Sequence, residues 1–382
     1  MSAPEVIVIG AGPAGLAAAA ELGCRRIPCT VLEQADSVAA SWRGRYDRLR
    51  LNTCRWTSRL SHSAYPAHTG LFPSRDQIVS YLEDYAQRHA LDVRVRTRVE
   101  RIDRHDERWK LQTSAGPYAA RQVIVATGHD HTPHIPAWPG RDRYTGRLLH
   151  AAAYRNADAF RGARVAVVGA GSSGLEIAYD LTEGGAERVW VCADPANIMP
   201  RQSGGLPGDL PAIALLRLPS SIADAQARLV RRLTIGDLSS YGLTPPAEGV
   251  FTRLHREGKA PAIVDKDIIQ AIRDGRIEIT PGLESFGHAS LVLTGGTQIT
   301  TDIVIAATGY TPGLEPLAGH LGVLNQRGLP RLHGGKAAAP GLRFIGYLPR
   351  PGQISHMSRE ARRAAKAIKN EAPGRTCLPP WR

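Results

Sequence analysis

The chain has 382 residues, of which 43% are hydrophobic, and its 48 Lys and Arg against 35 Asp and Glu give a formal net charge of +13. This length allows two domains with cores of their own, and no apolar run reaches the roughly 18–20 residues of a membrane span. The positive charge does not predict a nucleic-acid partner, because it is nearly all arginine, spread along the chain without a basic run or an aromatic platform. Five cysteines without a Cys-x-x-Cys pair argue against a disulfide framework, a metal site and cysteine-pair redox chemistry, and favour a reducing, cytoplasmic setting.

The first expected strand runs directly into a glycine-rich loop. Residues 5–9 read Glu-Val-Ile-Val-Ile, residues 10–15 read Gly-Ala-Gly-Pro-Ala-Gly, and an apolar helix follows over residues 16–22. In such a unit the first glycine permits a tight turn, the second lets backbone approach a pyrophosphate, and the third lets helix and strand pack closely. The helix N-terminus offers N–H groups to the phosphates. The next strand, residues 29–32, ends at Glu33, where a carboxylate would hold a ribose hydroxyl.

The same pattern occurs a second time. A strand over residues 163–168 leads into residues 169–174, Gly-Ala-Gly-Ser-Ser-Gly, and a helix begins at Leu175. This loop is too far along the chain to share the first unit, so it indicates a second nucleotide domain. A duplicated unit that has lost its ligand is the alternative.

Two further apolar strands end in Ala-Thr-Gly, over residues 122–128 and 302–309. Strands of this kind commonly close one nucleotide domain and lead to the next. Together with the loops they predict an α/β fold of two Rossmann-like dinucleotide-binding domains, similar to the flavin disulfide reductases. Two dinucleotides in one chain suggest a flavin and a nicotinamide.

A signature between the two loops carries a family resemblance. Tyr144, Gly146, His150 and Tyr154 follow the spacing F-x-G-x-x-x-H-x-x-x-Y/F, with tyrosine in place of the opening phenylalanine. That pattern resembles the fingerprint of class B flavin monooxygenases. The chain is most similar to YUCCA-type enzymes and their bacterial relatives, and the segments that share this likeness are residues 41–51, 72–85, 236–243 and 258–261.

The resemblance implies a reaction cycle. NAD(P)H reduces FAD, the reduced flavin reacts with molecular oxygen to form a C4a-(hydro)peroxide, and that species oxygenates a small molecule. Nitrogen or sulfur oxygenation and oxidative decarboxylation of a 2-oxo acid are all open. The alternatives are a flavin-dependent NAD(P)H reductase or dehydrogenase without oxygen insertion, and a nucleotide-sensing regulator without activity. A homodimer is also open.

Asn52 is the expected catalytic side chain. The family places an asparagine beside the flavin in this region, and an amide can donate a hydrogen bond without competing for protons; a plain turn asparagine is the alternative. His150 is expected to have a structural or gating role rather than that of a general base. Gln353 opens a segment, residues 353–356, whose backbone N–H groups are expected to point at the flavin ring.

The nicotinamide preference depends on two residues beyond the strand over residues 188–192. Asp194 would bind a ribose 2′-hydroxyl and repel a phosphate, which is the NADH pattern. Arg201 is placed to fold back onto a 2′-phosphate. NADPH is therefore expected, with NADH an unusually competent alternative.

We expect a discontinuous FAD domain, residues 1–155 and 301–372, around an NAD(P)H domain, residues 156–300. Pro and Gly clusters at 203–211 and 242–249 predict a loop-rich insertion in the latter. Its apolar helix, residues 222–233, is expected to pack on the core, although a lid, a membrane surface and a partner are alternatives. Residues 373–382 are expected to form a flexible tail.

No metal ligand is expected. The residues expected to bind the two cofactors are Gly10, Gly12, Pro13, Ala14, Gly15, Glu33, Gln34, Trp42, Arg43, Val99, Ala126, Thr127, Gly128, His150, Gly169, Gly171, Ser172, Ser173, Gly174, Asp194, Arg201, Thr308, Gly309, Tyr310 and Gln353.

Overall fold

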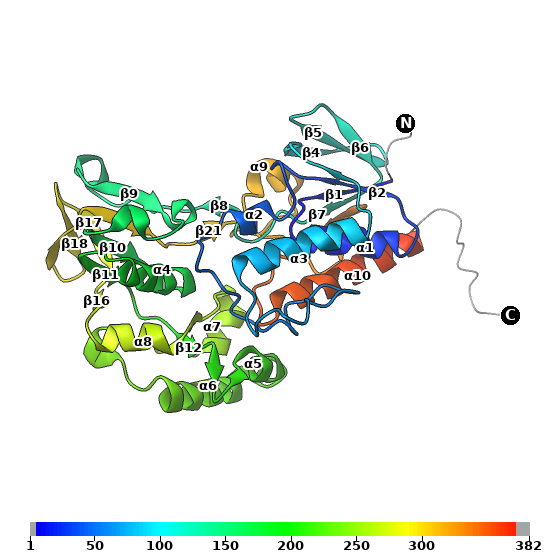
Figure 1. Ribbon diagram of the computed structural model, residues 1–382. Helices are drawn as coiled ribbons and strands as arrows, with labels where there is room; N and C mark the ends of the chain where they lie inside the picture. Colours follow the sequence, from blue (N-terminus) through cyan, green and yellow to red (C-terminus); the bar gives the residue numbers. More distant parts are fainter. Residues whose placement is uncertain (1–4, 372–382) are drawn as a thin grey trace.

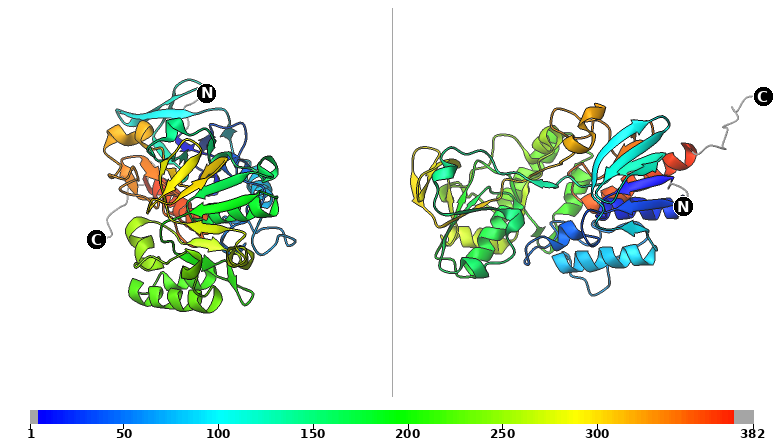
Figure 2. Two further views of the ribbon diagram at one scale, coloured as in Figure 1. Left: turned by 90° about the vertical axis from the view of Figure 1, so that its left-hand side faces the viewer. Right: turned by 90° about the horizontal axis from the view of Figure 1, so that it is seen from above.

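Each glycine loop lies at the end of a strand in its own mainly parallel sheet. The computed structural model describes residues 5–371 and has two lobes, shown at opposite ends of the molecule in Figure 1 and, from above, in Figure 2. The predicted α/β fold with two Rossmann-like domains is confirmed. The order of the first sheet is β22 (Ala337–Ala339), β23 (Leu342–Phe344), β7 (Gln122–Val125), β1 (Val6–Ile9), β2 (Cys29–Leu32) and β3 (Val93–Arg94).

The residues of β1 alternate between two cores, as a central strand requires. Val6 and Val8 pack with α1 (Pro13–Gly23), α3 (Arg75–Arg88) and α10 (Gln353–Glu371). Ile7 and Ile9 pack on the other side, which is covered by a small antiparallel sheet and a short helix. These covering elements are β4 (Val99–His105), β5 (Arg108–Thr113), β6 (Tyr118–Ala120) and α9 (Glu315–Ala318).

The second sheet repeats this arrangement with a different cover. Val165 and Val167 pack toward the helices, and Ala166 and Val168 pack toward a second antiparallel sheet. The order of the main sheet is β16 (Glu278–Thr280), β11 (Arg188–Cys192), β10 (Arg164–Val168), β20 (Ile303–Ala306) and β9 (Arg147–His150). The cover consists of α4 (Ser172–Glu183) and α8 (Lys266–Arg273) on one side and β17 (Leu283–Phe286), β18 (Ser290–Leu293) and β19 (Gln298–Thr300) on the other.

The two domain boundaries differ from those we expected at residues 155 and 301. Strands β9 and β20, which flank these positions, both lie in the second sheet and pair with each other. The chain instead crosses between the lobes at β8 (Thr132–Pro133) and β21 (Tyr310–Thr311), which pair antiparallel. Each crossing strand follows shortly after an Ala-Thr-Gly segment, which leaves the carboxyl edge of its sheet.

The insertion of the second lobe contains three helices, and the Pro and Gly clusters at 203–211 and 242–249 lie mainly in the turns and loops between its elements. It packs below the second sheet in Figure 1. The expected packing of residues 222–233 holds for one face only, because Ala223 and Ala227 are buried while Ile222, Leu229 and Leu233 are exposed. Its elements are β12 (Ile198–Pro200), β13 (Gln202–Ser203), β14 (Leu206–Pro207), α5 (Asp209–Leu215), α6 (Ser220–Thr234), α7 (Val250–Glu257) and β15 (Ala262–Val264).

Among the helices of residues 5–371, none is both long and apolar enough to cross a membrane. The expected tail at residues 373–382 lies outside the described residues.

Candidate cofactor and active site

The first glycine loop leaves one place open for a ligand. Gly10 has φ +101°, and a Cβ there would stand 2.7 Å from the carbonyl oxygen of Ala126, while a Cβ at Gly15 would overlap the carbonyl of Gly10. Both positions therefore need glycine for the fold itself. At Gly12 no heavy atom lies within 4 Å of a Cβ. The space there fits the close approach of a pyrophosphate.

The surroundings of this open space suit an anion and a ribose. Helix α1 begins at Pro13 with Gly12 as its N-cap, and no side chain caps it, so its N-terminal N–H groups face the open space. Glu33 follows β2, and its two carboxylate oxygens accept hydrogen bonds from the backbone N–H groups of Ala11 (2.7 Å) and Ala35 (2.9 Å). A carboxylate has about four lone-pair sites, so Glu33 braces the loop and keeps acceptors for ribose hydroxyls.

The second loop has the same geometry. Gly169 has φ +116° and a Cβ there would meet the carbonyl oxygen of Ala307 at 2.7 Å, while Gly174 abuts the carbonyl of Gly169. At Gly171 no atom lies within 4 Å of a Cβ, and α4 begins without a side-chain cap. The open position is retained in both loops, which argues against a second unit that has lost its ligand.

Asn52 lies at the junction of the two lobes. Its Nδ2 donates to Oγ of Ser172, at 3.3 Å, and that hydroxyl also accepts from the backbone N–H of Ile263 at 2.8 Å. A residue from the first lobe therefore touches the first turn of the helix that follows the second glycine loop. The side chain is half-buried and stays a candidate for contact with both cofactors.

Each residue of the fingerprint has a defined contact. The ring of Tyr144 covers Gly146, where a Cβ would overlap it, and its hydroxyl bonds the backbone and side chain of Thr301. His150 Nδ1 accepts from the N–H of Ala152 (3.0 Å), so Nε2 carries the proton and donates to the carbonyl of Gly309 (2.9 Å).

These contacts give His150 a positioning role at the start of the return crossing. It is buried, and burial lowers its pKa from the ordinary value of 6.5, which keeps the imidazole neutral near pH 7. The last fingerprint residue, Tyr154, donates from its hydroxyl to Asp180 on α4 at 2.7 Å.

Arg201 lies away from the position that we expected. Its guanidinium is 2% exposed and is paired with Glu176 of α4, so it faces a buried carboxylate and not an open phosphate site. The prediction of a phosphate contact was wrong because the backbone N–H of Arg201 donates to the carbonyl of Val264, which turns the residue into the interior. Asp194, in contrast, is exposed just beyond the carboxyl end of β11, where a residue that binds the ribose hydroxyls of a dinucleotide is expected.

The ion pair of Arg201 and Glu176 forms part of a buried polar cluster that the sequence did not indicate. Glu176 also accepts from the Tyr46 hydroxyl at 2.5 Å, and Nη1 of Arg201 donates to the carbonyl of Leu51 at 3.2 Å. Burial raises the pKa of Glu176, and Arg201 and the Tyr46 hydroxyl oppose that rise. The one available signal was a glutamate within the apolar run Leu-Glu-Ile of the second loop's helix.

The other expected cofactor residues divide between the carboxyl edges of the sheets and the surface. Thr127 bonds the hydroxyl of Tyr347 (2.8 Å), and Tyr310 on the crossing strand accepts from Arg45 (2.7 Å). Arg43 is an exposed partner of Glu83. Five residues lie in the first turns of the two loop helices: Ala14 and Gly15 in α1, and Ser172, Ser173 and Gly174 in α4. Five follow a strand of a main sheet: Gln34 after β2, Ala126 and Gly128 after β7, and Thr308 and Gly309 after β20. The remaining three are Trp42 in α2 (Ala40–Arg43), Val99 at the start of β4 and Gln353 at the start of α10.

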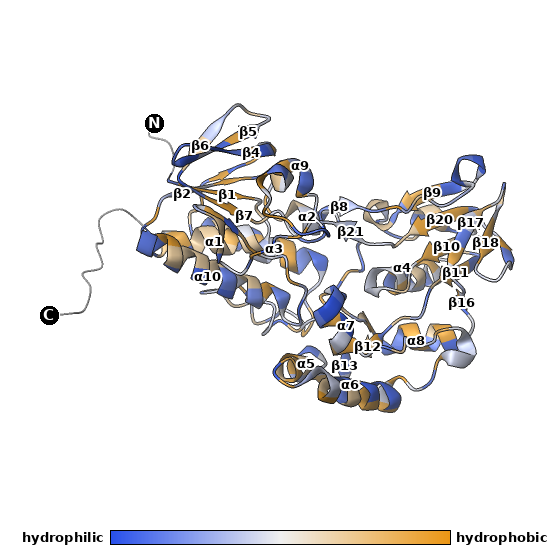
Figure 3. Cartoon of the chain, turned by 180° about the vertical axis from the view of Figure 1, so that it is seen from behind, coloured by the Kyte–Doolittle hydropathy of each residue, from blue (hydrophilic) through white to orange (hydrophobic). Residues whose placement is uncertain are grey.

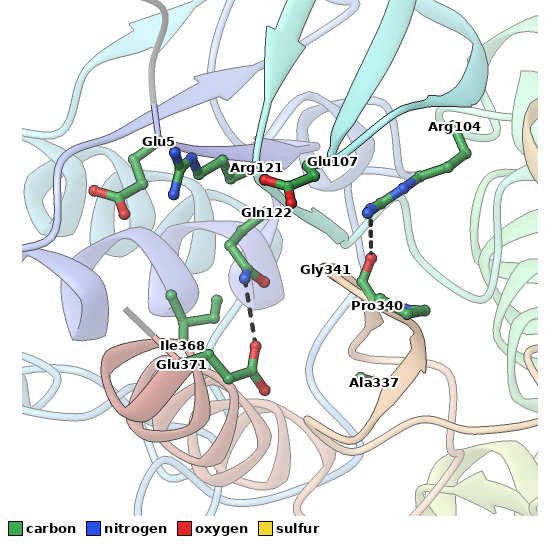
Figure 4. Close-up of a pocket in the computed structure, with 10 residues that line it drawn as sticks. All are labelled: Glu5, Arg104, Glu107, Arg121, Gln122, Ala337, Pro340, Gly341, Ile368 and Glu371. Atoms are coloured by element: carbon green, nitrogen blue, oxygen red, sulfur yellow. Dashed lines mark hydrogen bonds between the residues drawn. The ribbon is translucent and has the colours of Figure 1, made fainter. Parts of the chain in front are cut away.

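A cavity of 380 Å³ lies at the opposite edge of the first sheet (Figure 4). Glu5, Gln122 and Gly341, which line it, stand at the amino ends of their strands. Nucleotides bind at the carboxyl ends of parallel strands, so this cavity is not the cofactor site.

Comparisons with known proteins agree with this geometry. A family model described as pyridine nucleotide-disulphide oxidoreductase matches residues 7–203. Indole-3-pyruvate monooxygenase YUCCA1 of Oryza sativa subsp. japonica is 34% identical, over 80% of this chain and 77% of its own length. Indole-3-pyruvate monooxygenase YUCCA8 of Oryza sativa subsp. indica is 36% identical, over 80% and 75%. The chain belongs to the class B flavin monooxygenases.

The solved structures support the same fold. A flavin-containing monooxygenase from Stenotrophomonas maltophilia superimposes with a TM-score of 0.75 at 24% identity, covering 97% of this chain and 99% of that one. A bacillithiol disulfide reductase from Bacillus cereus follows with 0.70 at 20% identity, covering 97% and 99%.

This class B monooxygenase is a flavin-dependent oxidoreductase, as expected. The reductase alternative is not favoured by its relatives. Within the described residues, the cysteines are free and no group of three His, Cys, Asp or Glu side chains is placed to hold a metal. Cys54 is two residues from Asn52 in the sequence, but its thiol is buried and bonds Asp209 (3.5 Å).

Proposed function

We propose that this monooxygenase transfers one oxygen atom from molecular oxygen to a small organic substrate, and that 2-oxo acids are the substrate class to test first. The observation that carries the substrate class is the 34–36% identity to indole-3-pyruvate monooxygenases over 80% of the chain. The overall change would convert a 2-oxo acid, oxygen, NADPH and a proton into the shortened carboxylic acid, carbon dioxide, water and NADP⁺.

The residues of the chain have separate tasks in this proposal. The first loop and Glu33 hold FAD through its pyrophosphate and a ribose, and the loop at Gly171 holds NADPH. FAD supplies the two-electron chemistry and the reaction with oxygen when it is bound. Asn52 donates a hydrogen bond at the place where the two sites meet, and the surrounding protein excludes water.

NADPH is the expected donor, and we propose that NADH is unusually competent. Asp194 is exposed beyond β11 and suits a ribose 2′-hydroxyl. The guanidinium of Arg201, which we had expected at the 2′-phosphate, is held by Glu176 instead.

A single labelling experiment tests the reaction class. Purified protein carrying FAD is reduced anaerobically with NADPH and then mixed with isotopically labelled oxygen and indole-3-pyruvate, an aliphatic 2-oxo acid, a thioether or an amine. With catalase present to remove free hydrogen peroxide, one labelled oxygen atom in the organic product supports the monooxygenase, and the substrate that gains the label identifies the class. NADPH consumption that needs only an electron acceptor, with no label in any product, would establish the reductase alternative.

A further inference from the structure

Helix α6 presents an apolar stripe to solvent. Ile222, Leu229 and Leu233 are spaced by seven and four residues, which places them on one face of the helix. Leu229 is 56% exposed and Leu233 is 76% exposed. Leu206, Leu210, Leu218 and Val230, which lie on α6 or on the segment just before it, are exposed as well. We refer to these seven residues as the α5–α6 surface; Figure 3 shows apolar positions along both helices.

The opposite face of α6 fixes how the helix is turned. Ala223, Asp224 and Ala227 are buried there. The carboxylate of Asp224 accepts from the N–H of Phe251 (2.6 Å) and from the Thr252 hydroxyl (2.5 Å), so it caps the start of α7. Turning the stripe inward would leave this carboxylate without its partners, and therefore the fold itself keeps the apolar face pointing outward.

Arginines run beside the stripe. Arg228 and Arg232 are both exposed and lie one turn apart on one flank of it. In the part of the chain that the structure describes, neither forms an ion pair with a carboxylate. From residue 217 to residue 234 the sequence has four arginines and a single acidic residue, the buried Asp224.

We propose that the α5–α6 surface docks this monooxygenase onto the surface of an anionic lipid bilayer. A helix with leucines on one face and arginines beside them lies in the membrane interface, where the apolar side chains enter the acyl boundary and the guanidinium groups meet anionic headgroups. A second copy of the chain is the less suitable occupant, because it would bring the same arginines to the contact and no exposed acid of α6 to neutralise them. The inference does not depend on the proposed substrate.

The test uses the FAD-loaded full chain with sedimenting vesicles. Vesicles of phosphatidylcholine with phosphatidylserine should bind the protein, vesicles of phosphatidylcholine alone should bind it poorly, and added salt should weaken binding. Leu229→Gln/Leu233→Gln should abolish binding. Arg228→Gln/Arg232→Gln should lower the partition coefficient by about fivefold per arginine, about 25-fold in all.

Matched controls lie elsewhere on the surface. Leu332→Gln removes one exposed leucine of the first lobe, and Arg141→Gln/Arg143→Gln removes the same charge as the α6 pair; both should bind like the wild type. Equal loss in the two arginine pairs would show general charge attraction and overturn the proposal, as would binding that survives Leu229→Gln/Leu233→Gln. A dimer in light scattering that this leucine pair dissociates, without vesicle binding, would assign the surface to a second copy instead.

Discussion

At the scale of single residues, the middle glycine of each loop is the position that a ligand explains. Gly10 and Gly15 are required by contacts with the protein's own backbone, whereas Gly12 has neither a close neighbour nor a positive φ. A side chain at Gly12 would be compatible with the fold. Only the approach of another molecule accounts for glycine there.

The variant Gly12→Val should therefore fold and lose FAD. Its side chain would occupy the place of the pyrophosphate without meeting protein atoms, so the thermal midpoint of the apoprotein should change little. Absorbance of bound flavin after purification, together with the melting temperature, checks both statements. A folded Gly12→Val protein that keeps its full yellow cofactor would show that the site is misplaced. Gly171→Val is the counterpart, and it should weaken NADPH binding while FAD is retained.

Asn52 should control the coupling of NADPH oxidation to product. Removing a donor aimed at developing charge costs on the order of 10²–10³ in rate, so Asn52→Ala and Asn52→Asp should lower product per NADPH and release hydrogen peroxide, while anaerobic flavin reduction changes much less. Ser172→Ala is the matched variant, since it removes the hydroxyl that accepts from Asn52 and from the backbone N–H of Ile263 and leaves the amide of Asn52 in place. Unchanged product yield in Asn52→Ala would remove this residue from the active site.

Asp194 should set the preference between the two nicotinamides. Two unit charges about 4 Å apart interact by roughly 1–4 kcal/mol at surface dielectrics, so Asp194→Arg should shift the ratio of NADPH to NADH rates tenfold or more toward NADPH. Rates of anaerobic flavin reduction with each donor measure this ratio. A wild type that rejects NADH by more than about a thousandfold, with Asp194→Arg unchanged, would contradict the assignment.

At the scale of elements, the fingerprint residues connect β9 to the segment just before β21, the strand by which the chain returns to the first lobe. The neutral imidazole of His150 connects the end of β9 to Gly309, and the Tyr144 ring closes over Gly146 at the start of that strand. The motif thus holds the second Ala-Thr-Gly segment, which ends at Gly309, against the end of β9. A structural role of this kind accounts for all four residues without proton transfer.

The free energy of unfolding should depend on pH in a way that reflects the neutral imidazole of His150 in the folded protein. Burial lowers its pKa in the folded state below the ordinary 6.5, so the unfolded chain takes up the proton first as pH falls through 6.5. This group's contribution is complete above pH 6.5 and is lost below it, by up to about 1.4 kcal/mol per pH unit. Urea unfolding at several pH values should give a flatter acid limb for His150→Gln than for the wild type, while exposed His288→Gln should follow the wild type.

The elements that sequence predicted are those whose signal is local. The strands at residues 6–9 and 164–168 were predicted because short apolar runs meet glycine loops there. The insertion was predicted from its Pro and Gly clusters, but its short helices α5 and α7 were not, because those clusters mark the ends of helices as well as loops. The exposed face of α6 was assigned to the core because hydrophobic periodicity identifies an apolar face but not what covers it.

At the scale of the whole molecule, the active site depends on how the two lobes meet. The crossing strands β8 and β21 connect them, and the cluster of Tyr46, Glu176 and Arg201 joins the loop before Asn52 to α4. The sequence could not place Arg201, because its position follows from a turn of the insertion and from packing between residues far apart in the chain. Alignment of the flavin and nicotinamide sites is therefore a tertiary property.

Variants of Arg201 and Glu176 should show whether the cluster aligns the two sites, because its effect on the unfolding free energy can be separated from its effect on the yield of product per NADPH. Arg201→Met leaves the buried Glu176 carboxylate without its cation and should cost about 3–5 kcal/mol of unfolding free energy. The double variant Arg201→Met/Glu176→Gln removes both charges and keeps an acceptor for the Tyr46 hydroxyl, so it should recover most of that loss. Both variants lack the bond from Arg201 to the Leu51 carbonyl beside Asn52, and both should therefore give less product per NADPH. If coupling recovers together with stability in the double variant, the cluster serves only to hold the lobes together and does not position Asn52.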